Sequence, residues 1–203
     1  YSAGLAHALR EISDVRLNAD GDVNIYQIGN NHLHRDTYAR ALDKPGVVVL
    51  HDTVLNHFFL GTLERDQYVA EFVHNTGPWF ATFAEDLWAR RAKSATDPRY
   101  FQYPMLKRIL DSALEIIVHN DGALKAAGRG FVVPHLFEDP GPINGDSARH
   151  ELGVRPGVML AGIFGHLRES KRVLTVLRAV EELRRTGKQI ELLLAGDYVS
   201  RDL

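Results

Sequence analysis

An imidazole and a carboxylate follow directly on a short apolar run in the first third of the chain. Gly46–Asp52 reads Gly-Val-Val-Val-Leu-His-Asp, so His51 and Asp52 come immediately after four apolar residues. An imidazole whose pKa is near its ordinary value of about 6.5 can act as a general base or hold a ligand by a hydrogen bond. It can equally be a packed structural side chain. The residue types therefore allow proton transfer or ligand binding here without requiring either.

Polar residues also end the other expected strands of the first part of the chain. The segments Val23–Ile28, Glu115–Val118 and Phe131–Val133 each lead into Asn or His, as the run ending at Leu50 leads into His. The carboxyl ends of parallel strands meet at one edge of a sheet, which is the usual ligand crevice of such folds. Any single one of these residues could instead cap a helix or form a turn. Together they predict a cleft lined by Asn30, Asn31, Asp52, His119, Asn120 and His135.

A metal site is the next chemistry to weigh, because the chain contains ten histidines. His32 and His34 lie two residues apart, a spacing that suits one metal ion in extended chain. No HExxH or comparable spacing occurs, there is no cysteine to supply a thiolate, and metal coordination geometry is strict. We therefore expect no metal site.

The segment Ile163–Arg172, Ile-Phe-Gly-His-Leu-Arg-Glu-Ser-Lys-Arg, indicates a different chemistry. A predicted strand ends at Gly165, and a loop containing Arg168 leads to Lys171 at the start of a helix. The N-terminus of a helix offers free N–H groups and a partial positive charge, and a lysine adds a full charge, a combination that suits phosphate. The spacing is not that of a Walker loop. The alternative is a surface turn followed by a solvated basic helix.

The elements that position these residues alternate between strand and helix. The run Val47–Leu50 is typical of a strand buried on both faces of a parallel sheet that helices cover. Further strands are predicted at Val23–Ile28, Glu115–Val118, Phe131–Val133, Val158–Phe164 and Ile190–Ala195, with a short one near Val15 and Leu17. Helices are predicted at Tyr1–Glu11, Leu33–Leu42, Thr53–Leu63 with Asp52 or Thr53 as N-cap, Gln67–His74, Trp79–Ala92, Tyr103–Ala113, Gly122–Ala127, Ser147–Leu152 and Lys171–Arg185.

The domain organisation follows from a change of composition at residues 138–157, which are rich in Pro and Gly and predict a linker. Residues 1–137 are expected to form a Rossmann-like domain, a parallel sheet with helices on both faces, and residues 158–203 the start of a second Rossmann-like domain. The net charge of −2 gives no pull toward nucleic acid. The absence of cysteine excludes a disulfide framework and fits a reducing cytoplasm.

Five short segments of the chain, in order, resemble the bacterial group 1 glycosyltransferases. They are Tyr-Gln-Ile-Gly-Asn-Asn-His-Leu-His at 26–34, Pro-Gly-Val-Val-Val-Leu-His-Asp at 45–52, Ile-Val-His-Asn at 117–120, Val-Val-Pro-His at 132–135 and Phe-Gly-His-Leu-Arg-Glu-Ser-Lys-Arg at 164–172. The resemblance implies an incomplete GT-B architecture. It also implies a hexosyltransferase-type enzyme that moves a sugar from a nucleotide-diphosphate sugar to an acceptor hydroxyl with retention of configuration. Residues 1–137 would be its acceptor-side domain, and residues 158–203 the beginning of its nucleotide-sugar-binding domain.

The resemblance also implies roles for individual residues. His51 matches a strand-end histidine that contacts the donor sugar near the reacting carbon, and Lys171 matches the basic residue that stabilises the leaving diphosphate. Gly165, His166 and Arg168 would bind the donor diphosphate together with Lys171. His166 replaces an arginine often found after that glycine, and Arg168 is a candidate to supply the missing charge.

The family pattern places a Gly-rich loop before Tyr1 and a pair of Glu residues beyond Leu203, so these 203 residues alone are expected to show little or no transfer. The implied partners are a nucleotide-sugar donor and a glycan, lipid-linked or small-molecule acceptor, with no cofactor and no nucleic acid. A cytoplasmic location is implied, with the inner face of the membrane as an option. The aromatic stretch Trp79–Trp88 could cradle a sugar or lie on a lipid surface, although its helical spacing favours core. The alternatives are a non-catalytic sugar- or nucleotide-binding module on the same scaffold and a metal hydrolase using the histidines.

Overall fold

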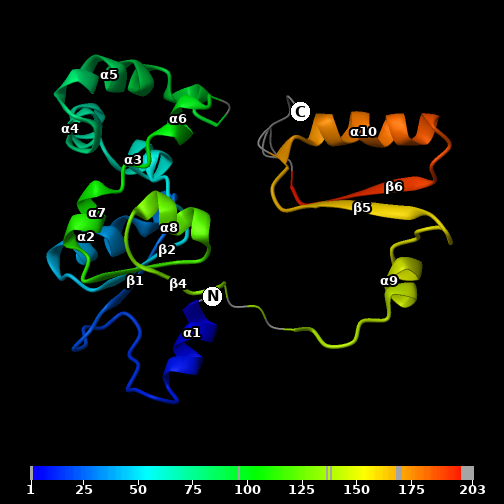
Figure 1. Cartoon of the computed structure of the whole chain (residues 1–203), viewed down its shortest axis with the longest axis horizontal. Helices are drawn as coiled ribbons and strands as arrows, with labels where there is room; N and C mark the ends of the chain where they lie inside the picture. The colour runs from blue at the N-terminus through cyan, green and yellow to red at the C-terminus, as the bar shows by residue number, and fades with distance from the viewer. Residues whose placement is uncertain (1, 96, 136, 138, 168–170, 198–203) are drawn as a thin grey trace. The chain divides into compact units, whose positions relative to one another are not determined.

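The computed structural model describes residues 2–95, 97–135, 137, 139–167 and 171–197. The chain divides into two compact units, Tyr1–Phe137 and Glu138–Leu203, which we call the N-terminal and C-terminal units (Figure 1). The predicted α/β class is confirmed, because a parallel sheet and its helices make up most of the N-terminal unit. Within the described residues, no helix is both long and apolar enough to cross a membrane.

The N-terminal unit contains a four-stranded sheet and a larger set of helices. In chain order its elements are α1 (Ser2–Leu9), β1 (Ile25–Ile28), η1 (His32–His34), α2 (Arg35–Asp43), β2 (Val47–Leu50), α3 (Asn56–Thr62), α4 (Arg65–Thr76), η2 (Pro78–Phe80), α5 (Ala81–Ala89), η3 (Arg91–Lys93), α6 (Arg99–Gln102), α7 (Lys107–Ser112), β3 (Glu115–Val118), α8 (Asp121–Ala127) and β4 (Phe131–Val132). The strands pair in the order β1-β2-β3-β4, and every pair is parallel. All four strands therefore end at the same edge of the sheet.

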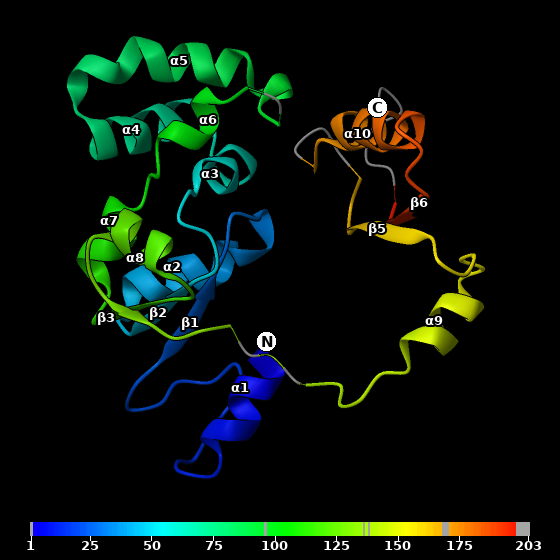
Figure 2. The ribbon, with the colours of Figure 1, turned by 45° about the vertical axis from the view of Figure 1, so that its right-hand side comes forward.

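One face of this sheet carries the hydrophobic core. Alternate residues of the strands point to this face, and they are fully or almost fully buried: Tyr26, Ile28, Val48, Leu50, Ile116 and Val118. Residues of α2, α7 and α8 belong to the same core, so these three helices cover one face. This placement follows from chain order, because right-handed crossovers between strands added in one direction put every connecting helix on the same side. Figure 2 shows α4, α5 and α6 as a further layer beyond α3.

The opposite face of the sheet is covered less completely than the prediction of helices on both faces requires. Val49, in the centre, is buried, but Ile25 on β1 is 44% exposed and Phe131 on β4 is 62% exposed. The core cluster of the described residues contains neither of them. The expectation rests on the apolar run of β2 alone. That run is buried because β2 is a central strand, whereas the edge strands β1 and β4 are open on this face.

Several expected helices of the N-terminal unit differ from those in the structure, and Trp79–Ala92 is divided among η2, α5 and η3. The predicted helix Leu33–Leu42 is divided between η1 and α2, and α3 begins at Asn56 after Leu55 rather than after an Asp52 or Thr53 cap. The predicted helix Tyr103–Ala113 is wrong in its first turn, since α7 begins at Lys107. Pro104 explains the error, because a residue before proline is driven out of the helical region, and Tyr103 is extended at φ −114° and ψ 105°. No strand forms near Val15 and Leu17, where the chain is irregular.

The aromatic stretch Trp79–Trp88 contributes mainly to the core. Leu87 is fully buried and Trp88, Phe80 and Phe83 pack against the core cluster, as the helical spacing favoured. Trp79 differs, since it is 94% exposed.

The C-terminal unit contains one βαβ arrangement. Its elements are α9 (Gly145–Glu151), β5 (Met159–Phe164), α10 (Val173–Arg185) and β6 (Ile190–Ala195). β5 and β6 are parallel over their full length, from the Met159–Ile190 pair to the Phe164–Ala195 pair. The predicted bounds of β6 are confirmed, and α10 begins two residues later than predicted.

Candidate functional site

The side chain of His51 is positioned by the end of β2. Its backbone N–H donates to the carbonyl of Ile28 at 2.8 Å, which extends the pairing of β1 and β2 by one residue. Its ring Nε2–H donates to Oε1 of Gln27, a β1 residue, at 2.6 Å. Gln27 therefore fixes the orientation of the ring, because an amide oxygen can only accept. The opposite ring nitrogen, Nδ1, is directed toward the end of β3.

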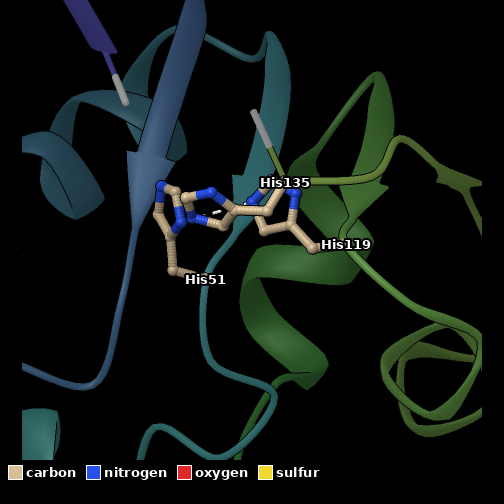
Figure 3. A group of neighbouring side chains, drawn as sticks. All are labelled: His51, His119 and His135. Carbon is tan, nitrogen blue, oxygen red and sulfur yellow. Dashed lines mark hydrogen bonds between the residues drawn. The ribbon is translucent and has the colours of Figure 1, made fainter. Parts of the chain in front are cut away.

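His119 and His135 meet His51 at this edge of the sheet. Figure 3 shows the three imidazole rings gathered beyond the strand ends. Nε2 of His119 lies 3.3 Å from Nδ1 of His51, and the Nδ1–H of His119 donates to the carbonyl of Val133 at 2.9 Å. The His135 ring centroid is 4.8 Å from that of His119 and 6.1 Å from that of His51. One ring nitrogen of each residue lies within 4.8 Å of those of the other two, and we call this group the histidine cluster.

The surroundings of His51 favour its neutral form. Burial lowers the pKa of the imidazole below its ordinary value of 6.5, and the imidazoles of His119, His135 and His34 lower it further. The Asp52 carboxylate opposes this shift by favouring the protonated form. The net direction is downward, so His51 is neutral at pH 7 and can accept a proton or bind an electrophile through a ring nitrogen.

The loop after β1 is tied to Asp52 and to α3. The N–H of Asn30 donates to Oδ2 of Asp52 at 2.8 Å, and Oδ1 of Asn30 accepts from the N–H of Phe58 at 2.8 Å. A side chain at Gly29 would place its Cβ 3.1 Å from Oδ2 of Asp52 and 3.2 Å from Nε2 of His34. Glycine therefore permits this close approach. Asn30 and Asp52 lie at the predicted edge, but their polar atoms hold the loop in place.

Two predicted cleft residues are helix caps. Oδ1 of Asn31 accepts from the N–H of Leu33 at the start of η1, and Oδ1 of Asn120 accepts from the N–H of Ala123 at the start of α8. Both side chains have the structural role that Asn commonly has in front of a helix. They lie at the carboxyl edge, yet their oxygens are engaged by the backbone.

The predicted phosphate-binding residues lie in the C-terminal unit. Gly165 follows β5 with φ +89°, a left-handed conformation that strains any other residue, and a Cβ there would meet nothing within 4 Å. His166 and Lys171 are exposed. Arg172 is the N-cap of α10 with φ 52°, so Lys171 stands one residue before the cap rather than inside the helix. Arg168 lies outside the described residues.

The structure thus brings His51, His119 and His135 together and groups Asn30 with Asp52. Sequence reasoning paired His32 with His34 as possible metal ligands, but both belong to the short helix η1, and Nδ1 of His34 binds the carbonyl of Gln27 at 2.9 Å. Gln27 was missed altogether. The signal that could have found it is a single polar residue inside the apolar strand Ile25–Ile28, since a polar side chain there needs a hydrogen-bond partner.

No protein-family model matches the chain, and no curated protein is significantly similar to it. Function is therefore inferred from the geometry of two places. One is the histidine cluster at the carboxyl edge of the N-terminal sheet. The other is the loop from Gly165 to the start of α10 in the C-terminal unit.

Proposed function

We propose that the chain carries out, or belongs to a protein that carries out, transfer of a sugar from a nucleotide-diphosphate sugar to an acceptor hydroxyl with retention of configuration, on a GT-B scaffold. The observation that carries the proposal is the meeting of His51, His119 and His135 at the carboxyl edge of a parallel sheet. That edge is where α/β folds usually bind their ligands. The resemblance of the five short segments to group 1 glycosyltransferases gives the ligand its chemical class.

The donor diphosphate is assigned to the C-terminal unit. The open backbone at Gly165 lets a phosphate approach, and the first N–H groups of α10, which as in any helix have no intrahelical partner, favour an anion. Lys171 is exposed beside them and supplies a full positive charge. These groups would stabilise the negative charge that develops on the leaving diphosphate, which is electrostatic catalysis. In the N-terminal unit, His51 would orient the sugar.

Binding of nucleoside diphosphates tests the donor part of the proposal. The chain is titrated calorimetrically with UDP, GDP and ADP in the presence of EDTA, together with Lys171→Ala and a matched control, Lys188→Ala. Lys188 is also exposed and lies beyond the other end of α10. A hydrogen bond to a charged group contributes about 1.5–3 kcal/mol, so Lys171→Ala should weaken binding by about tenfold or more. Lys188→Ala should bind as the native chain does.

Two results would contradict the proposal: none of the three diphosphates binds, or Lys171→Ala and Lys188→Ala lose affinity equally. Turnover separates an enzyme from a binding module on the same scaffold. In any preparation that transfers sugar, Lys171→Ala should lower kcat, because the charge it stabilises develops in the transition state. A binding module would lose affinity alone.

A further inference from the structure

The histidine cluster has a feature that sugar binding leaves unexplained: the directions of its ring nitrogens. Oε1 of Gln27 and the carbonyl of Val133 are acceptors, so Nε2 of His51 and Nδ1 of His119 must carry protons. In the neutral form of each ring the other nitrogen then has a lone pair. These are the two atoms that face one another, Nδ1 of His51 and Nε2 of His119, at 3.3 Å. The two lone pairs can share a cation.

The separation of these two nitrogens matches that between two histidine ligands of one metal ion. Zn²⁺ binds histidine nitrogen at about 2.0–2.1 Å with tetrahedral angles, which places two ligand nitrogens about 3.3–3.4 Å apart. The observed distance between Nδ1 of His51 and Nε2 of His119 is 3.3 Å. A ring nitrogen of His135 lies within 4.8 Å of one ring nitrogen of each of the other two, on an exposed side chain that follows β4. A modest ring movement would complete the set.

The supporting hydrogen bonds are those expected around a histidine ligand. Metal-binding histidines commonly donate their second ring N–H to a carbonyl or carboxylate, which fixes the tautomer and orients the ring. Gln27 does this for His51, and the carbonyl of Val133 does it for His119. His51 and His119 directly follow β2 and β3, so the sheet positions their rings, whereas His135 stands three residues beyond the end of β4 at Val132.

We propose that His51, His119 and His135 bind one divalent first-row transition metal ion, with Zn²⁺ as the best-fitting candidate. Three imidazoles leave a fourth tetrahedral position for water or a ligand oxygen, the arrangement found in catalytic zinc sites. Imidazole nitrogen suits zinc, copper and nickel better than it suits magnesium or calcium, which prefer oxygen. The metal site and the proposed glycosyl transfer share His51, but their tests fail separately: Zn²⁺ binding tests the histidines, and diphosphate binding tests Lys171.

The test is a titration of the whole chain with Zn²⁺ by calorimetry, and with Co²⁺ by visible absorption, because tetrahedral Co²⁺ absorbs strongly and octahedral Co²⁺ does not. One ion per chain is expected. His135→Ala removes an exposed ligand, so it should cost little folding stability. Loss of a residue that only supports a metal ligand weakens metal binding by about 10–100-fold, and loss of a ligand itself should weaken Zn²⁺ binding at least as much. His150→Ala, an exposed histidine in the C-terminal unit, is the control and should bind as the native chain does.

A second pair of variants tests the orientation of the rings. Gln27→Leu removes the acceptor for His51 and should weaken Zn²⁺ binding by about 10–100-fold, whereas Gln27→Glu keeps an acceptor and should bind at least as tightly as the native chain. Circular dichroism confirms that each variant is folded. The proposal is overturned if Zn²⁺ does not bind, if His135→Ala and His150→Ala bind alike, or if Gln27→Leu binds as the native chain does.

Discussion

The two places where the chain is expected to bind ligands are built differently. At the end of the N-terminal sheet, the polar side chains hold one another: Gln27 binds His51, and His51 meets His119. In the C-terminal loop, His166 and Lys171 are exposed and make no side-chain hydrogen bond to another described residue. The first place is preorganised, since the fold has already ordered its side chains. The second presents exposed side chains next to the open backbone at Gly165.

This difference matters for affinity and for specificity. Ordering a long side chain on binding costs about 0.5–1.5 kcal/mol, so a lysine in a loop binds an anion less tightly than its charge suggests. A preordered imidazole group carries less of this cost. The N-terminal edge is therefore suited to selecting a geometry, such as that of a metal ion or a sugar ring. The C-terminal loop is suited to recognising charge.

The contrast extends to the packing within each unit. Phe72 in α4 is fully buried and its ring contacts those of Tyr68, Phe83 and Tyr103, whereas Leu177 in α10 is 45% exposed. Phe72→Ala should lower the free energy of unfolding of the N-terminal unit by about 3–5 kcal/mol. Leu177→Ala should cost about 1 kcal/mol, because only part of its apolar surface is removed from water.

Urea unfolding measures both changes separately. Both tryptophans of the chain, Trp79 and Trp88, lie in the N-terminal unit, so their fluorescence follows that unit alone. Far-ultraviolet circular dichroism adds the loss of α10. Phe72→Leu, which retains part of the buried volume, is the control and should lose less stability than Phe72→Ala. Equal losses of unfolding free energy in Phe72→Ala and Leu177→Ala would contradict the inference that the N-terminal unit is packed more tightly than the C-terminal unit.

Substitutions of Asn120 distinguish a helix-capping role from a ligand-binding role at the carboxyl edge of the N-terminal sheet. Its side chain accepts from the N–H of Ala123 at 2.8 Å, so Asn120→Ala should destabilise the N-terminal unit by about 1 kcal/mol. Asn120→Ser keeps a capping oxygen and should restore most of that loss. Neither change should alter Zn²⁺ affinity, because Asn120 is not one of the three ligands. A large loss of Zn²⁺ affinity in Asn120→Ser at native stability would place this side chain in the binding site instead.

The sequence predicted the strands better than it predicted the helix starts. The strand bounds at Glu115–Val118 and Ile190–Ala195 are confirmed, because a short apolar run between polar residues leaves little room for another interpretation. Helical periodicity alone extended a helix through Tyr103, where Pro104 prevents it. The sequence of β2 could not predict whether helices cover the second face of the sheet. A central strand is buried whether or not the edge strands β1 and β4 are.

The site was predictable in location but not in detail. Parallel strands that end in histidine must bring those histidines to one edge, so the meeting of His51 and His119 follows from topology. Which ring nitrogen faces which depends on side chains of neighbouring strands, Gln27 above all. The capping roles of Asn31 and Asn120 were recognised only as alternatives, because the same residue type serves caps and ligands.

The smallest effect expected is an acid dependence specific to the N-terminal unit. Hydrogen bonds from the side chain and from the backbone N–H of Arg99 lower the pKa of Asp97 below its ordinary value of 3.8. The folded protein then holds the proton less tightly than the unfolded chain, so the stabilisation is present above pH 3.8 and is lost as the pH falls through the lower folded pKa. Asp97→Asn should reduce this loss, so that the urea midpoint measured by tryptophan fluorescence falls less between about pH 5 and about pH 2.5.

Asp66→Asn is the control, because Asp66 is an exposed carboxylate in the same unit whose ion pair is with its sequence neighbour Arg65. If the acid limb were as steep in Asp97→Asn as in Asp66→Asn, the pairing with Arg99 would contribute nothing to the acid sensitivity of this unit.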